Sequence, residues 1–257
     1  MLAEQWLLWA GAGAFLLFVT LSFFRIKKLP GYAAFAGCLC IIATMLLRWY
    51  TTGRAPWATV YETAAVLALI TGVAASYTYR KKEAPAMYLT LSAIAILLLA
   101  FSALSWEAHV ALAPALDSGW LLVHVPVLIL AYGMFAVSFA ASAGFLTLRI
   151  SGKKDKKTYQ RLDKVSYMST IAGLALLFLG VGLGALWAKI VWGAYWSWDP
   201  KEIWSAITAI VYLLYLAARL FKLKPEDAAL ISILGFLSVI FTYFGVTYLI
   251  PGLHGEI

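Results

Sequence analysis

Long apolar runs separated by short polar segments dominate the sequence. Eight runs come close to or exceed the roughly 20 residues that a helix needs to cross the ~30 Å hydrocarbon core of a bilayer. They cover about residues 5–24, 32–48, 61–79, 86–104, 120–148, 167–187, 204–221 and 228–249. Many runs are apolar on every face, so their length indicates a helix better than their periodicity does. The pattern predicts an all-α polytopic membrane protein with about eight transmembrane helices.

The composition agrees with this pattern and excludes a soluble globular protein. Of the 257 residues, 63% are hydrophobic and 12% are charged, and the mean hydropathy is +0.87. The formal net charge of +8 would favour nucleic acid as the partner of a soluble chain, but the bases here lie in short loops between apolar runs. We therefore expect the lipid bilayer, and no nucleic acid, as a partner. The sequence has no internal repeat or linker, so residues 1–257 are expected to form a single integral membrane domain.

The lysines and arginines are distributed unevenly between the two sets of loops. Sixteen of the 20 follow the first, third, fifth and seventh runs, whereas Arg48, Arg54, Lys189 and Lys201 fall on the opposite side. The side richer in bases faces the cytoplasm, so both termini are expected on the outer, periplasmic or extracytoplasmic side. The first run follows Glu4 and precedes a group of bases, which is the reverse of the charge order in a cleavable signal. We expect it to be retained in a multi-pass protein of the cytoplasmic (inner) membrane.

The stretch from Trp187 to Trp204, WAKIVWGAYWSWDPKEIW, is a chemical exception in this aliphatic chain. It contains five tryptophans and one tyrosine among four charged residues, and the predicted topology assigns it to the outer side. Tryptophan and tyrosine also collect in the interfacial belts of membrane proteins, which accounts for one or two such rings but less easily for this cluster. We predict that residues 187–204, called the tryptophan-rich segment below, form a flat aromatic platform for a large planar ligand.

The Asp-Pro-Lys-Glu end of this segment also has the pattern of a helix start. Asp199 would be the N-cap, Pro200 the first helical residue and Glu202 the third residue after the cap, as in a capping box. A ligand contact by Asp199 is compatible with this structural role, because the cap would fix the direction in which the segment enters the helix.

All three histidines fall on or near the predicted outer face. His109 lies in a loop, His124 near the start of the fifth run and His254 in the C-terminal tail. Two neutral imidazoles that face each other can ligate haem iron axially, so His124 and His254 with the tryptophan-rich segment predict a haem site. For each histidine taken singly, a hydrogen-bonded anchor at the membrane interface is the alternative. Zinc is less favoured, because acidic and thiol ligands do not occur nearby at metal-binding spacing.

The remaining polar groups in apolar surroundings are interpreted structurally. Arg48, Arg54, Lys189 and Lys201 are expected to snorkel to lipid phosphates, with pairing to haem propionates as the alternative. Glu62, at the outer edge of the third run, is expected to be solvated. The two cysteines have C-x-C rather than C-x-x-C spacing and are expected to be small packing residues. Residues 151–164 are expected to form a solvated basic loop beside anionic headgroups.

Several stretches resemble the haem-handling proteins of cytochrome c biogenesis. WGAYWSWDPKEIW resembles their tryptophan-rich WWD signature. PALDSGWLLVHV and FTYFGVTYLIPGLHGE resemble the regions around the two outer histidines of the CcsA (ResC-like) branch of system II, and they match His124 and His254. GRAPWATVYET resembles the outer loop of that branch that leads into a helix. The resemblance covers most of the chain, which is thereby identified as a member of this branch.

The resemblance implies haem b (iron protoporphyrin IX) bound outside the cytoplasmic membrane, with His124 and His254 as axial ligands of the iron. The residues expected beside the ring are Trp192, Gly193, Trp196, Trp198, Asp199 and Trp204. A CcsB (ResB-like) membrane subunit is implied as a partner, and because this chain contains no such portion we expect the separate-subunit form. Together the subunits would form a cytochrome c haem lyase (synthase) that exports haem. They would present haem for thioether attachment to the Cys-x-x-Cys-His motif of apocytochrome c.

One position departs from the family pattern. Members of the branch carry a histidine near the inner end of the seventh helix, within Tyr-Leu-His-x-Arg, and this chain has Ala217 there. That histidine is associated with a haem site inside the membrane. Its replacement leaves the outer site intact but weakens the case for haem capture from the inner side. The resemblance assigns no role to His109.

Two other functions compete with the lyase subunit. One is a protein that holds or transfers haem without ligase activity. The other is a b-type electron-transfer subunit, which ranks last because such proteins usually hold haem between histidines at mid-membrane depth, where this sequence has none.

Overall fold

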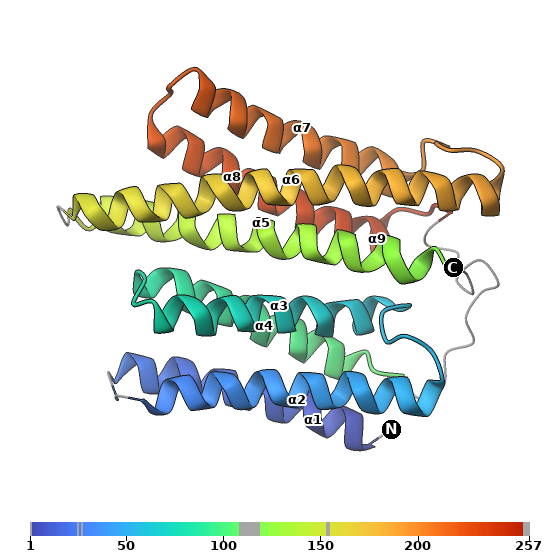
Figure 1. Ribbon diagram of the computed structural model, residues 1–257, viewed down its shortest axis with the longest axis horizontal. Coiled ribbons are helices and arrows are strands. Elements are labelled where there is room, and N and C mark those ends of the chain that lie inside the picture. Colours follow the sequence, from blue (N-terminus) through green and yellow to red (C-terminus); the bar gives the residue numbers. More distant parts are fainter. Residues whose placement is uncertain (1, 25, 27, 108–118, 153–154, 254–257) are drawn as a thin grey trace. The chain divides into compact units, whose positions relative to one another are not determined.

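The computed structural model describes residues 2–24, 26, 28–107, 119–152 and 155–253, without the side chains of Leu2 and Leu121. All regular structure in these residues is helical (Figure 1). The elements in chain order are α1 (Leu2–Phe23), α2 (Leu29–Thr52), α3 (Val60–Arg80), α4 (Pro85–Leu104), α5 (Leu121–Ile150), α6 (Lys156–Trp192), α7 (Pro200–Leu220), α8 (Pro225–Ile240), the π-helical turn η2 (Phe241–Gly245) and α9 (Val246–Leu249). Eight of the helical stretches are long and apolar enough to cross a membrane. The predicted all-α, multi-pass membrane architecture is confirmed.

The chain divides into two compact units, and each is a bundle in which consecutive long helices are antiparallel (Figure 1). Unit 1 is residues 1–111 and contains α1 to α4, in which α1 packs on α2 and α4, and α3 packs on the same two helices. Unit 2 is residues 112–257, in which α5 packs on α6 and α8, and α7 packs mainly on α8. The single membrane domain over residues 1–257 stays a prediction.

Proline and glycine mark several helix ends, as their backbone chemistry requires. Pro85, Pro200 and Pro225 occupy the first turns of α4, α7 and α8, where the missing N–H would have no helical partner in any case. Gly53 and Gly193 end α2 and α6 with φ angles of 66° and 79°, a left-handed conformation that glycine adopts without steric cost. Gly193 therefore decides where the tryptophan-rich segment leaves α6.

Helix α6 is longer than the sequence predicted. Its 37 residues begin at Lys156, so most of the stretch expected as a solvated loop is the first three turns of a helix, and that prediction is wrong. The Asp155 side chain starts the helix by accepting a hydrogen bond from the Thr158 backbone N–H at 3.0 Å. Hydrogen bonds from Thr158 also hold the pKa of the Asp155 carboxyl below its ordinary value. Helix-forming polar residues can extend a transmembrane helix beyond the apolar run, because water satisfies their side chains there.

The last transmembrane helix is interrupted, which the sequence did not predict. The apolar run 228–249 corresponds to α8, η2 and α9 in succession. The Thr242 side chain in η2 donates to the carbonyl of Ser238, one turn earlier, at 2.8 Å. A π-helical turn inserts one extra residue and shifts the faces of the helix that follows. The final helical turn of unit 2 is thereby re-aimed before the chain reaches Pro251.

A buried ionic network closes the end of unit 1 where α2 ends and α3 begins. Arg48 is 1% exposed, and its Nε donates to Oε1 of Glu62, which is 0% exposed, at 2.8 Å. Its other nitrogens lie 3.7 Å from Glu4 and 2.9 Å from the Tyr61 hydroxyl. Glu4 in turn accepts a hydrogen bond from the Trp106 indole at 2.9 Å. The network thus joins α1, α2, α3 and the segment after α4.

Glu62 is the centre of this network and also of the N-terminus of α3. Its carboxylate accepts from the backbone N–H groups of Ala58 and Thr59 at 3.0 and 3.2 Å, in a capping box with Thr59. Arg54 adds a two-pronged ion pair with 2.8 and 2.9 Å contacts. The predictions that Arg48 snorkels to lipid and that Glu62 is solvated are therefore wrong, because each is the other's buried partner.

A different polar cluster, made of neutral hydroxyls, lies inside unit 2. Ser138 on α5 lies 2.8 Å from the Thr170 hydroxyl on α6 and 2.9 Å from the Ser232 hydroxyl on α8. Ser166 on α6 continues the cluster to the Tyr215 hydroxyl on α7 at 3.0 Å. All these side chains are buried, so the cluster connects the four long helices of this bundle.

Candidate functional site

His124 lies in the first turn of α5 against the last turns of α6. Its Nδ1 is 2.8 Å from the backbone carbonyl oxygen of Gly180. Its ring is nearly parallel to that of Trp187, with ring centroids 6.3 Å apart and an angle of 12° between the planes. The half-buried imidazole is therefore fixed by one polar contact and one aromatic contact, both from α6.

Gly184 provides the space for this imidazole. A Cβ at position 184 would lie 2.5 Å from Cε1 and 2.9 Å from Nδ1 of His124, distances that real side chains do not reach. Gly180 and Gly184 are four residues apart and therefore share one face of α6. Gly182 lies between them in sequence, and a Cβ there would meet nothing within 4 Å. Gly180 contributes its carbonyl oxygen and Gly184 leaves space for the ring, and we call these two residues with Trp187 the seat of His124.

The contact with Gly180 sets the chemistry of the imidazole. A carbonyl oxygen only accepts hydrogen bonds, so a neutral imidazole bonded to it carries its proton on Nδ1 and its lone pair on Nε2. An imidazole whose Nδ1–H is held by a backbone carbonyl is a common form of metal-ligating histidine, because the bond fixes both tautomer and ring orientation. His124 therefore has a fixed orientation, with Nδ1 engaged by the Gly180 carbonyl.

The first part of the tryptophan-rich segment packs around this histidine. Trp187 is 3% exposed, and its ring meets that of Trp192 edge to face, with centroids 4.7 Å apart at 70°. The chain then leaves α6 at Gly193, whose carbonyl accepts a hydrogen bond from the Lys189 ammonium at 2.7 Å. The Lys189 ammonium also lies 5.5 Å from the centre of the Tyr195 ring.

The second part of the segment is more open. Trp198 has a φ of 61° and is 73% exposed. Its ring meets that of Trp196 at 89°, with centroids 5.9 Å apart. Within each of the two tryptophan pairs the rings are steeply inclined to each other, so the two rings of a pair do not lie in one plane. The predicted single flat platform is wrong for these rings, although the segment does expose aromatic surface.

Asp199 caps helix α7, as the sequence predicted. Its Oδ1 accepts from the Lys201 backbone N–H at 2.9 Å, and the Glu202 carboxylate accepts from the Asp199 backbone N–H at 3.1 Å. Glu202 also accepts from the backbone N–H of Ser197 at 2.8 Å. The capping box is confirmed, and the same carboxylate ties the open part of the tryptophan-rich segment to α7.

The C-terminal part of the described chain returns to this cap. A Cβ at Gly252 would lie 2.7 Å from Oδ2 of Asp199 and 2.8 Å from Cδ of Pro200, so only glycine permits so close an approach. Trp204 packs against Phe241 of η2 with ring centroids 4.1 Å apart. The end of the tryptophan-rich segment and the chain that leads to the C-terminus are therefore in contact.

The structure thus brings the predicted residues together in two groups within unit 2. His124, Trp187, Trp192 and Gly193 lie at the end of α6, whereas Trp196, Trp198, Asp199 and Trp204 lie at the start of α7. His254 and His109 fall outside the described residues, so the second predicted ligand stays a prediction. Sequence reasoning missed Gly180, Gly184 and Gly252, although the Gly-x-x-x-Gly spacing in LGVGLG could have indicated a close approach to α6.

No group of three or more His, Cys, Asp and Glu side chains that could hold a metal ion occurs among residues 2–107, 119–152 and 155–253, leaving aside 25 and 27. His124 is the histidine among these residues, and it lies beside the Trp187 ring.

Comparison with known proteins identifies the family. The model of the family described as "Cytochrome C assembly protein" matches residues 57–254. The cytochrome c biogenesis protein CcsA of Guillardia theta is 32% identical over 84% of this chain and 81% of its own length. CcsA of Chlamydomonas reinhardtii is 35% identical over 84% of this chain and 65% of its own length. The chain belongs to the cytochrome c assembly protein family and is CcsA-like.

Two further similarities concern larger proteins. Protein NrfI of Wolinella succinogenes is 36% identical over 82% of this chain, which spans only 24% of NrfI. The solved structure of the cytochrome c haem lyase CcmF matches with a TM-score of 0.66 and 18% identity, over 95% of this chain and 49% of CcmF. At this identity the likeness to CcmF shows a shared fold. The chain therefore corresponds to a part of each of these two proteins.

Proposed function

We propose that this chain is the haem-handling subunit of a cytochrome c synthase complex in the cytoplasmic membrane. It would export or present haem at the outer face for thioether attachment to the Cys-x-x-Cys-His motif of apocytochrome c. The observation that carries the proposal is the seat of His124, where the Gly180 carbonyl and the Trp187 ring orient one imidazole beside the tryptophan-rich segment. Membership of the cytochrome c assembly family supports it.

The residues of the site fit haem b. His124 would bind the iron through Nε2, since Nδ1 is engaged by Gly180, and His254 would supply the opposite imidazole. Trp192, Trp196, Trp198 and Trp204 offer apolar ring surfaces to the macrocycle, while Gly193 and Asp199 fix the path of the chain between them. When bound, haem supplies the vinyl groups to which the two apocytochrome thiols add. The protein positions the ring and limits the access of water to it.

Sidedness and partner complete the proposal. Sixteen of the 20 bases follow the first, third, fifth and seventh apolar runs, whereas the tryptophan-rich segment follows the sixth, and this pattern of the sequence supports an outer site and outer termini. A CcsB (ResB-like) subunit would act with this chain, and the lyase activity would belong to the complex. The chain spans 49% of the haem lyase CcmF and 24% of NrfI.

The test is the absorption spectrum of the purified full chain, wild type against His124→Ala and His254→Ala. We expect bound haem with a low-spin bis-histidine spectrum in the wild type, and loss of that spectrum in each variant. Holocytochrome c formed by cells that carry the same variants should fall at unchanged protein level. Unaltered haem binding and unaltered cytochrome c in both variants would sink the proposal.

The same seat of His124 would also suit a second candidate, a haem-holding or transfer protein without ligase activity. It predicts the same bis-histidine spectrum in the purified chain. The two candidates separate when the chain is reconstituted with its partner and an apocytochrome. Thioether product measured by the absorption of its pyridine haemochrome supports the synthase, whereas bound haem b without product supports the holding protein.

A further inference from the structure

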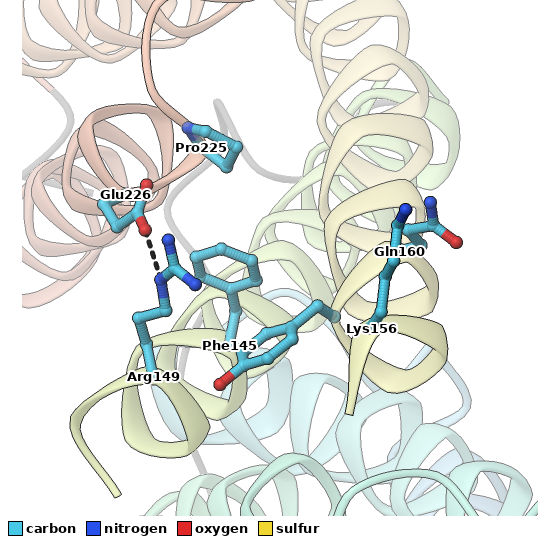
Figure 2. Close-up of a pocket in the computed structure, with 7 residues that line it drawn as sticks. Phe145, Arg149, Lys156, Gln160, Pro225 and Glu226 are labelled. Carbon is cyan, nitrogen blue, oxygen red and sulfur yellow. Dashed lines mark hydrogen bonds and ion pairs between the residues drawn. The ribbon is translucent and has the colours of Figure 1, made fainter. Parts of the chain in front are cut away.

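A groove of about 340 Å³ lies at the opposite end of unit 2 from the tryptophan-rich segment. It forms where α5 ends and where α6 and α8 begin, and Figure 2 shows its lining. Seven residues contribute to it: Phe145, Arg149, Lys156, Tyr159, Gln160, Pro225 and Glu226. The groove therefore combines an apolar base with cationic side chains, and the proposed haem site does not include it.

The aromatic residues give the groove a fixed wall. Phe145 is buried, and its ring meets that of Tyr159 edge to face with centroids 5.4 Å apart. The Arg149 guanidinium lies over the Tyr159 ring at 5.6 Å. In Figure 2, Arg149 lies between Phe145 and Glu226, with which it forms an ion pair. These contacts hold the guanidinium in place before any ligand binds, so little side-chain entropy is lost on binding.

Arg149 retains donors for an anion despite this ion pair. The bond to Glu226 uses Nε, which is one of five N–H donors on a guanidinium. The side chain is 58% exposed, so its outer nitrogens face the solvent side of the groove. Lys156 adds a second exposed cation on the first turn of α6. Both side chains line the groove, and guanidinium and ammonium groups are the usual protein ligands of phosphate.

The net positive charge around the groove favours the binding of an anion, even though Arg149 already pairs with the Glu226 carboxylate. Residues 149–164 contain seven bases and two acids, a formal charge of +5. These residues belong to the helix ends that carry most of the bases, and the cytoplasmic leaflet of a membrane carries anionic lipid. Basic pockets between transmembrane helices on that side are suited to lipid headgroups. The apolar base then suits the first part of an acyl chain.

We propose that this groove binds an anionic phospholipid of the cytoplasmic leaflet. The phosphate lies between Arg149 and Lys156, and the start of one acyl chain lies on Phe145 and Pro225. The volume of about 340 Å³ is at the small end of the range for ligand pockets, so it accepts a headgroup and part of one chain rather than a whole lipid. This inference does not depend on the haem site, but it rests on the sidedness given under the proposed function.

The experiment titrates phosphatidylglycerol or phosphatidylcholine into the full chain in a neutral detergent and counts bound lipid by native mass spectrometry. The key comparison is Lys156→Gln against Lys157→Gln, because the two lysines are adjacent and lose the same charge, but only Lys156 lines the groove. We expect a preference for phosphatidylglycerol that falls about fivefold in Lys156→Gln. In Lys157→Gln it should change less than twofold.

A second variant tests the groove without changing charge. Gln160→Trp fills it from the first turns of α6 and should reduce phosphatidylglycerol binding at least as much as Lys156→Gln. Both variants are checked for an unchanged elution volume and thermal unfolding curve. Equal losses in Lys156→Gln and Lys157→Gln, no preference for phosphatidylglycerol, or unaltered binding in Gln160→Trp would each overturn the proposal. Loss of bound haem with unaltered lipid binding would assign the groove to an anionic cofactor instead.

Discussion

The two units bury polar groups in different ways. Unit 1 buries full charges, with Arg48, Glu62 and Glu4 enclosed where α2 ends and α3 begins. Unit 2 buries neutral hydroxyls, with Ser138 and its partners contributed by all four long helices of the bundle. Both networks cross between helices, yet one is ionic and sits at helix ends, while the other is uncharged and sits among apolar faces.

The difference follows from the free energy of desolvation. Removing a charged side chain from water costs several kcal/mol unless ion pairs and hydrogen bonds replace the lost hydration. Unit 1 meets this requirement at a helix N-terminus, where backbone N–H groups and two arginines surround Glu62. A hydroxyl costs much less to bury and is satisfied by one or two neighbours. Charges therefore need a helix end, whereas hydroxyls can lie along the helices.

The units also differ in their relation to the proposed function. The described residues that we assign to the haem site are all in unit 2, at the ends of α5, α6 and α7. The ionic network of unit 1 contains none of them. We therefore expect variants in unit 1 to change stability first, and variants at the His124 seat to change haem binding first.

The largest effect is expected from Arg48→Met, which breaks the ionic network of unit 1. It leaves Glu62 and Glu4 buried without their shared cation, so the free energy of unfolding should fall by about 3–5 kcal/mol. Unfolding in mixed micelles with increasing denaturing detergent measures this. The matched control is Arg54→Met, because the Arg54 side chain is 21% exposed and should cost less than half as much. An equal loss in the two variants would contradict the difference between buried and exposed cations.

A smaller effect, on haem rather than on stability, is expected from Gly184→Ala. The added Cβ would overlap the His124 imidazole, and disturbing such a support of a metal ligand weakens binding by about 10- to 100-fold. Gly182→Ala is the control, since its Cβ would meet nothing within 4 Å and its gain in helix propensity is the same. Haem retained by the purified variants is measured by absorption. Equal retention by both would show that Gly184 is not the seat of His124.

The smallest effect is expected from Ser138→Ala in the hydroxyl cluster of unit 2. It removes a hydroxyl with partners on α6 and α8, and because such an interhelical bond contributes about 0.6 kcal/mol on average in a membrane protein, the loss of two should cost about 1 kcal/mol. Ser92→Ala is the comparison, because the Ser92 hydroxyl donates within its own helix to Tyr88 and should cost about 0.5 kcal/mol or less. Denaturing-detergent titrations of both variants check this. A loss as large as that of Arg48→Met would remove the distinction between charged and neutral networks.

The sequence predicted the helices well, because a long apolar run indicates a transmembrane helix without knowledge of the residues that pack against it. It also predicted the cap at Asp199, since a capping box is read within four consecutive residues. The start of α6 at Lys156 was missed, because hydropathy marks where lipid begins and ends but not where a helix does. The interruption at η2 was missed too, since the same apolar residues suit an α-helix and a π-helical turn.

Contacts between distant residues were harder to predict. Arg48 and Glu62 each looked costly to bury when taken alone, and only the fold makes them partners. The seat of His124 depends on the backbone carbonyl of Gly180 and on the absence of a side chain at Gly184, 56 or more residues away. His124 could be singled out from the sequence because histidine is rare in this chain and has distinctive chemistry. Gly180 and Gly184 have no side-chain chemistry that would single out their positions in the sequence.

Helix α6 connects the two ends of unit 2 as one continuous helix. Its first turn carries Lys156 at the proposed lipid groove, and its later turns carry Gly184 at the seat of His124. The two positions are about 42 Å apart along an unbroken helix without proline. A tilt of only about 5° at one end displaces the other end by nearly 4 Å, more than a hydrogen bond can follow. A small change in the contact between the bilayer surface and the first turn of α6 would therefore move the seat of His124 relative to α7.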